Sequence, residues 1–242
     1  MEIKIYEDYA AMSDAASDMI LEVIRKKPNA LLCFATGDTP KLTYQELVQK
    51  ILVQRVDVSA ISIIGLDEWQ NIPPKNPGSC HYFLHEYLSD PLKLDASQVH
   101  LFDALSTTPE LECEKMNAFI DAKGGIDLML VGVGMNGHVG FNEPGASLNA
   151  RAHLAQLEDI TKAIGQKYFA EKADIEKGYT LGFAQVMEAG TLIVAANGSR
   201  KASVMKLAVQ GEVTNEFPVS LARNHKNAYL VIDQEAATEI NH

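Results

Sequence analysis

The sequence predicts an α/β fold in which an open, mostly parallel sheet has helices on both faces. Short apolar segments alternate along the chain with longer segments in which apolar residues recur at helical spacing. Several of the short segments are almost entirely apolar, as expected of strands buried on both faces of a parallel sheet. Polar loops follow these segments, at the end of the strands where ligands bind in such folds.

The first half of the chain predicts strands and helices in alternation. Residues 3–6 have alternating apolar positions, as in a short strand, and residues 9–25 have apolar residues at helical spacing. Apolar runs at 30–35 and 60–65 predict buried strands, and a helix follows each of them. These two helices lie at about 40–52 and 79–88. A strand at 99–102 and a helix at 109–122 complete this half.

The second half begins with the most apolar predicted strand, residues 126–132, which ends in a glycine-rich loop. Further strands are predicted at 180–183, 191–196 and 228–232, and helices at 160–170 and 199–209. No long linker, low-complexity tract or internal repeat marks a boundary in the 242 residues. We therefore expect a single domain over 1–242.

Composition and charge exclude several classes of partner. The net charge of -11 opposes binding to nucleic acid or to an anionic lipid surface, and no basic run outweighs it. No segment is apolar for long enough to span a membrane. The three cysteines, Cys33, Cys80 and Cys113, lack CxxC spacing, and residues 1–4 lack a signal-peptide pattern. These features predict a soluble cytoplasmic protein whose cysteines are small packing residues.

The segment 36-TGDTP-40 predicts an anion-binding helix start after a buried strand. Gly37 allows a turn, Thr39 is the expected N-cap and Pro40 the first helical residue. Backbone N–H groups would then point toward a phosphate, and the side chain of Asp38 would point away from it. The alternative is a capped helix start that binds nothing.

The segment 66-LDEW-69 places two adjacent carboxylates after the next buried strand. Successive side chains of an extended segment leave in opposite directions, so at most one of them faces the ligand crevice. Asp67 is the candidate for that position. The alternative is that Asp67 only caps a turn and Glu68 is solvated.

The loop 132-GVGMNGHVGFNEPG-145 combines several glycines with His138 and Glu143. A histidine with a nearby carboxylate forms a base with an orienting partner, although a structural histidine is the alternative. The loop also contains a GxGxxG pattern. A dinucleotide site is disfavoured because that pattern belongs at the first strand-to-helix turn, whereas here it lies halfway along the chain and precedes Asn-Glu-Pro.

Lys201 follows Gly198 at the start of a predicted helix, where a cation and the helix N-terminus could hold an anion together. A solvated lysine is the alternative. His81 and His85 share one predicted helix face but lack the HExxH pattern, and no other set of side chains has metal-ligand spacing. We predict no metal and no cofactor.

These segments, in this order, resemble the glucosamine-6-phosphate deaminase/isomerase family over nearly the whole chain. The resemblance is carried by TGDTP, LDEW, GVGMNGHVGFNEPGASL and NGSRKA. Residues 35–51, 66–69, 77–80 and 136–145 look closest to the galactosamine-6-phosphate isomerase branch. The resemblance implies a Rossmann-like sheet of the sugar-phosphate isomerase type, which 6-phosphogluconolactonases and ribose-5-phosphate isomerases share.

The resemblance also implies an enzyme that forms a ketohexose 6-phosphate and ammonia from an amino-sugar 6-phosphate. Asp67 matches the base that moves a proton from the second to the first carbon of the open-chain sugar. His138 matches the residue that helps to open the ring, and Glu143 matches its acid/base partner. The phosphate-binding positions correspond to Thr36, Gly37, Asp38, Thr39 and Lys201.

Three departures from the family pattern stand out. Asn136 occupies a position in the catalytic loop where glucosamine-type deaminases have Asp, and Lys167 occupies that of a phosphate-binding Arg. The segment 151–155 lacks the paired basic residues of allosteric members. Two alternatives remain open, a 6-phosphogluconolactonase-type hydrolase and a non-catalytic sugar-phosphate sensor. Oligomeric state is not predicted.

Overall fold

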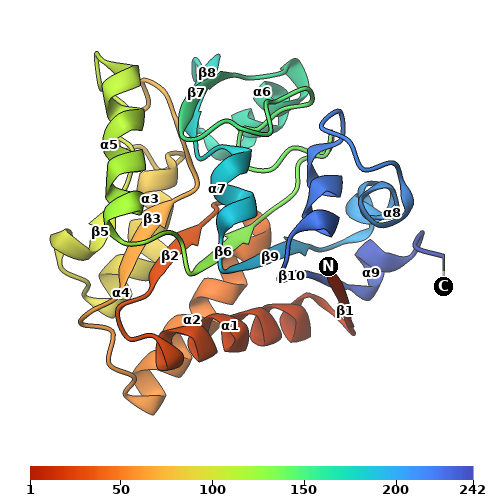
Figure 1. The fold of residues 1–242 in the computed structure, drawn as a ribbon, viewed down its shortest axis with the longest axis horizontal. Coiled ribbons are helices and arrows are strands. Elements are labelled where there is room, and N and C mark those ends of the chain that lie inside the picture. Colours follow the sequence, from red (N-terminus) through yellow and green to blue (C-terminus); the bar gives the residue numbers. More distant parts are fainter. Residues whose placement is uncertain (242) are drawn as a thin grey trace.

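A computed structural model describes residues 1–241, and its main feature is a sheet of seven strands (Figure 1). Every paired strand in this sheet runs parallel to its neighbour. In order across the sheet, the strands are β1 (Glu2–Tyr6), β10 (Ala228–Asp233), β9 (Thr191–Ala196), β6 (Leu128–Val131), β2 (Leu31–Phe34), β3 (Ser62–Gly65) and β5 (Val99–His100).

The strand order reverses between β2 and β6. The chain proceeds outward from β2 to β3 and β5, returns to β6 on the other side of β2, and then proceeds outward to β9 and β10. In an open α/β sheet, ligands bind at the carboxyl ends of the strands beside such a reversal. The topology therefore places the candidate site at the loops that follow β2 and β6.

Helices cover both faces of this sheet, as the sequence predicts. The helices α1 (Tyr9–Lys26) and α2 (Asp38–Gln54) lie together on one face, where they pack on Leu32 and Phe34 of β2 (Figure 1). The opposite face carries the alternate side chains of the same strands, such as Cys33. It is covered by α5 (Pro109–Ala122), α7 (Phe183–Glu188), α8 (Ala202–Gln210) and α9 (Gln234–Ala237).

A second, smaller sheet was not predicted. It consists of β4 (Asp67–Trp69), β8 (Lys177–Thr180) and β7 (His153–Gln156), and the central strand β8 is antiparallel to both neighbours. Its small core contains Trp69, whose ring centroid lies 4.6 Å from that of Phe141. Phe141 belongs to the loop after β6, so this sheet packs directly against that loop.

Several predicted elements differ in the structure. The strand predicted at 180–183 is wrong, because β8 ends at Thr180 and α7 begins at Phe183. Tyr179, Leu181 and Phe183 are all buried, so their apolar character reflects packing rather than extended backbone. The helix predicted at 79–88 is divided into α3 (Cys80–Leu84), a π-helical turn (His85–Ser89) and α4 (Asp90–Leu92).

Two further predicted helices are also subdivided. The helix predicted at 160–170 is α6 (Asp159–Gly165) followed by a 3₁₀ turn (Gln166–Tyr168). The helix predicted at 199–209 is a 3₁₀ turn (Ser199–Lys201) followed by α8. The remaining 3₁₀ segments are Ala96–Gln98 and Pro218–Asn224. Within residues 1–241, every helix is too short or too polar to cross a membrane. The three cysteines are buried free thiols.

Candidate active site

Four loops meet at the carboxyl ends of neighbouring strands. Residues 36–39 follow β2, Asp67 follows β3, the loop 132–145 follows β6 and Lys201 comes shortly after β9. Since the strands are parallel and adjacent, their carboxyl ends lie at one edge of the sheet. The predicted catalytic and phosphate-binding segments therefore share that edge.

The segment 36–39 begins α2 in a way that differs from the prediction. Gly37, with φ of 115°, is the N-cap, and the helix starts at Asp38, so Thr39 is not the cap. This left-handed backbone favours glycine, and an added Cβ would lie 3.0 Å from the hydroxyl oxygen of Tyr168. The Thr39 hydroxyl instead donates to Oδ1 of Asn197 at 2.6 Å. That bond ties the loops after β2 and β9 together.

Two lysine ammonium groups lie beside this helix start. Lys167 pairs with the exposed carboxylate of Asp38 at 2.6 Å, and Lys201 donates a hydrogen bond to the backbone oxygen of Val133. Burial, with a smaller effect from the Lys167 charge, lowers the pKa of Lys201 to about 8. An anion bound between these two cations would relieve their mutual repulsion and shield the buried charge.

Asp67 is partly exposed and carries an unusually basic carboxylate. Burial raises its pKa to about 6, although the His138 charge and a hydrogen bond from Cys80 oppose the rise. The Cys80 thiol donates to Oδ1 of Asp67 at 3.7 Å and accepts from the Thr36 hydroxyl at 3.1 Å. A chain of hydrogen bonds thus links the loop after β2 to Asp67.

Glu68 points away from Asp67, as expected for adjacent residues of a strand, but it is not solvated. Only 1% of it is exposed. Its carboxylate accepts backbone N–H bonds from Trp69, Cys80 and His81 at 2.8, 3.0 and 2.7 Å. Burial nevertheless raises the pKa of Glu68 to about 7. This residue joins β4 to the start of α3 and is structural, so the alternative of a solvated Glu68 is wrong.

His138 and Glu143 are in direct contact. The Nδ1 atom of His138 lies 3.2 Å from Oε2 of Glu143 and 3.1 Å from the hydroxyl of Thr161. Burial alone would raise the pKa of Glu143, but the hydrogen bond and charge of His138, with bonds from Thr161 and Asn136, lower it to about 2. Glu143 is therefore an ionised partner for the imidazole, and the opposite ring nitrogen, Nε2, is left for a ligand.

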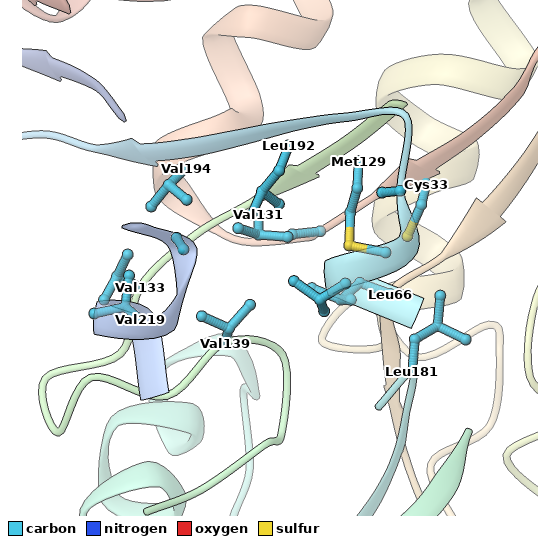
Figure 2. Packing of buried hydrophobic residues seen from close by; sticks show 14 of the residues in the cluster. Cys33, Leu66, Met129, Val131, Val133, Val139, Leu181, Leu192, Val194 and Val219 are labelled. Carbon is cyan, nitrogen blue, oxygen red and sulfur yellow. The ribbon is translucent and has the colours of Figure 1, made fainter. Parts of the chain in front are cut away.

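Two glycines of the loop, Gly134 and Gly137, are required by packing and by backbone conformation. A Cβ at Gly134 would lie 2.3 to 2.5 Å from ring atoms of His138, so only glycine leaves room for the ring. Gly137 has φ of 83°, which glycine tolerates. The neighbouring Val133 and Val139 are buried in the core on the face of the sheet opposite α1 and α2 (Figure 2). Packing and backbone conformation therefore explain Gly134 and Gly137 of the GxGxxG pattern, whereas a Cβ at Gly132 would have no atom of residues 1–241 within 4 Å apart from its chain neighbours.

The structure adds residues that the sequence did not indicate. Thr161 is buried in α6 and bonds the imidazole, Cys80 bonds Asp67, and Asn197 bonds Thr39. Their contacts could not be read from local patterns, since each contact joins distant segments. Asn136, a predicted site residue, donates to Glu143 at 2.8 Å. Across residues 1–241, no group of three potential metal ligands converges.

The chain is similar to known proteins over most of its length. The family described as glucosamine-6-phosphate isomerases/6-phosphogluconolactonase matches residues 7–231. A glucosamine-6-phosphate deaminase of Halothermothrix orenii is 35% identical over 98% of this chain and 99% of its own. AgaI of Escherichia coli strain K12, which carries the name of a deaminase, is 38% identical over 94% of this chain and 90% of its own.

Solved structures are similar as well. A monomeric glucosamine-6-phosphate deaminase has a TM-score of 0.95 and 28% identity, and the match covers 99% of this chain and 100% of the other. A 6-phosphogluconolactonase from Trypanosoma brucei has a TM-score of 0.80 and 20% identity, covering 99% and 98% of the two chains. The second likeness concerns the fold alone.

Proposed function

The chain belongs to the glucosamine-6-phosphate isomerase/6-phosphogluconolactonase family, and from this premise we propose that it converts an amino-sugar 6-phosphate to a ketohexose 6-phosphate and ammonia. The observation that carries the proposal is a basic carboxylate, Asp67, within electrostatic reach of the His138–Glu143 pair. A lactone hydrolase needs no base that removes a proton from carbon. An isomerase does.

Ring opening is the first step and uses His138. Its free Nε2 takes the proton of the C1 hydroxyl and returns a proton to the ring oxygen, which yields the open-chain aldehyde. The ionised Glu143 bonds Nδ1 and stabilises the imidazolium that forms between these two transfers.

Asp67 then moves a proton between carbons. With a pKa of about 6, its carboxylate is ionised at neutral pH and is more basic than an ordinary aspartate. It removes the proton from C2 while the substrate ammonium group passes a proton to the C1 oxygen, which gives an enolamine, and it then delivers its proton to C1. The resulting imine at C2 adds water and releases ammonia, which leaves the ketone. Atoms and charge balance with water as the second substrate.

The phosphate group is assigned to the start of α2. The groups proposed to bind it are the backbone N–H groups of residues 37–39, the hydroxyl of Thr36, and the ammonium groups of Lys201 and Lys167. Asp38 contributes its backbone N–H, while its side chain is exposed and pairs with Lys167. Binding the distant phosphate would hold C1 and C2 near Asp67.

The sequence likeness to the galactosamine-6-phosphate branch favours galactosamine 6-phosphate as substrate and tagatose 6-phosphate as product. Glucosamine 6-phosphate, which would give fructose 6-phosphate, is the second candidate. A side-by-side assay of ammonia release from both sugars tests the proposal. Lactone hydrolysis without ammonia release from either sugar would refute it. So would binding of both sugar phosphates without turnover, the behaviour of a sensor.

A further inference from the structure

The side-chain amide of Asn136 lies between two carboxylates. Its Nδ2 donates to Oε2 of Glu143 at 2.8 Å and to Oε2 of Glu158 at 2.8 Å. Its oxygen accepts from the backbone N–H of His138 at 3.3 Å. A primary amide has two N–H donors, so Asn136 can satisfy both carboxylates at once. These partners also fix the orientation of the amide, because ionised carboxylates only accept and a backbone N–H only donates.

Glu158 supports Glu143 in a second way. It precedes α6, and its backbone N–H donates to Oε1 of Glu143 at 3.2 Å. The two oxygens of Glu143 are therefore bonded to Asn136 and to the backbone of Glu158. The Glu158 side chain itself is exposed, and it reaches the imidazole of His138 only through Asn136 and Glu143.

The charges make a donor at position 136 necessary. Glu143 is ionised, and Glu158 adds a second carboxylate on the other side of the amide. An aspartate at position 136 would replace two donors by a group that only accepts. Three carboxylates without a donor between them repel one another and separate. Glu143 would then lose its placement against Nδ1 of His138.

We propose that Asn136 and Glu158 are a coupled pair of positioning residues, in which Glu158 requires a donor at position 136 and Asn136 holds Glu143 against His138. This inference rests on the ring-opening role of the His138–Glu143 pair in the proposed function.

A double-mutant cycle tests the coupling. Asn136→Asp alone should lower kcat at least about thirtyfold and change KM less than about threefold, since the phosphate contacts lie elsewhere. Glu158→Gln alone should cost less than about threefold, because the new amide oxygen still accepts from Asn136. In the double variant the new amide can donate to the aspartate, so kcat should rise at least about threefold above that of Asn136→Asp, while the missing bond from position 136 to Glu143 keeps it below the wild type.

The matched control is Asp159→Asn. Asp159 is the next residue and an exposed carboxylate, but it pairs with Lys162 at 2.9 Å. It should not rescue Asn136→Asp. If the double variant is as impaired as Asn136→Asp, or if Asp159→Asn rescues equally well, the coupling of Asn136 to Glu158 is refuted.

Thermal unfolding of the same variants separates this inference from the proposed function. Asn136→Asp should lower Tm by about 2 to 6 °C, and Glu158→Gln should restore part of that loss, whatever the substrate is. A wild type that releases no ammonia, with this Tm pattern intact, would refute the function and leave the coupling standing. Ammonia release without rescue of either kcat or Tm would refute the coupling alone.

Discussion

The two sheets of the molecule differ in their surroundings and in what they contribute to the site. The seven-stranded sheet is covered on both faces, and the loops after β2 and β9 carry the groups assigned to phosphate binding. The three-stranded sheet begins at Asp67 and packs through Trp69 against Phe141, in the loop that carries His138. Most groups assigned to binding thus lie in the loops after β2 and β9, and the groups assigned to chemistry lie in the small sheet and in the loop against which it packs.

This separation leads to a general expectation for variants. Substitutions in the loops after β2 and β9 should mainly change KM, and substitutions in the small sheet or in the loop 132–145 should mainly change kcat or stability.

The largest effect is expected at Asp67, in the small sheet. Asp67→Asn should lower kcat roughly 10²- to 10⁴-fold because it removes the general base, with KM nearly unchanged. Burial raises the pKa of Asp67 to about 6, so its ionisation disfavours the folded state as pH rises from about 4 to 6. The variant should therefore be more stable at pH 7.5, by up to about 2 kcal/mol.

Steady-state kinetics and denaturant unfolding at pH 7.5 measure both effects. A kcat within tenfold of the wild type, or a large rise in KM alone, would show that Asp67 is not the base.

The adjacent residue should behave in the opposite way. Glu68→Ala removes the acceptor of three buried N–H groups and leaves a cavity, so it should cost on the order of 3 kcal/mol of unfolding free energy. Glu68→Gln keeps one side-chain oxygen as an acceptor and should cost about half as much. Urea unfolding gives both values. A stable, inactive Glu68→Ala variant would mean that Glu68 acts in the chemistry.

At the large sheet, Lys201→Met should weaken substrate binding. Loss of a charge-assisted bond to phosphate costs about 1.5 to 3 kcal/mol, or roughly a tenfold to hundredfold rise in KM with kcat little changed. Lys206→Met is the control, since Lys206 is an exposed lysine in α8. A selective loss of kcat in Lys201→Met would contradict the division between the sheets.

The smallest effect is expected at Cys80. For the wild type, kcat/KM should fall as pH decreases through about 6, because protonated Asp67 cannot accept a proton. The Cys80 thiol opposes the raised pKa of Asp67, so Cys80→Ala should move this acid limb to higher pH by less than about one unit. Cys80→Ser retains a donor and should move it less. An unchanged profile in Cys80→Ala would show that the thiol does not act on Asp67.

The large sheet could be predicted from the sequence, and the small one could not. Central strands of the large sheet, such as β2 and β6, are buried on both faces, so their residues are apolar and the pattern is clear. The strand β4 has only three residues, two of them acidic, and β7 has polar residues at both ends. Such strands form because neighbours pair with them, which a local pattern does not record.

The same difference applies within the candidate site. Asp67, His138 and Glu143 lie in dense local motifs that the sequence displays directly. Thr161 bonds His138 across 23 residues of sequence, and Glu158 bonds Glu143 across 15. The strand β7 of the small sheet lies between the two partners in each case. The predicted N-cap of α2, Thr39, was wrong because the cap is Gly37, which makes no side-chain hydrogen bond. Sequence patterns for caps depend on a side chain that accepts such a bond.

The contact between Trp69 and Phe141 gives the protein a built-in optical probe. Trp69 is the only tryptophan in the sequence, and it lies almost fully buried against the loop that holds His138. Its fluorescence therefore reports the local state of that loop without a label and without a competing indole elsewhere. Substrate binding, loop movement and unfolding of the small sheet can each be followed in the wild-type chain by the emission of this single residue.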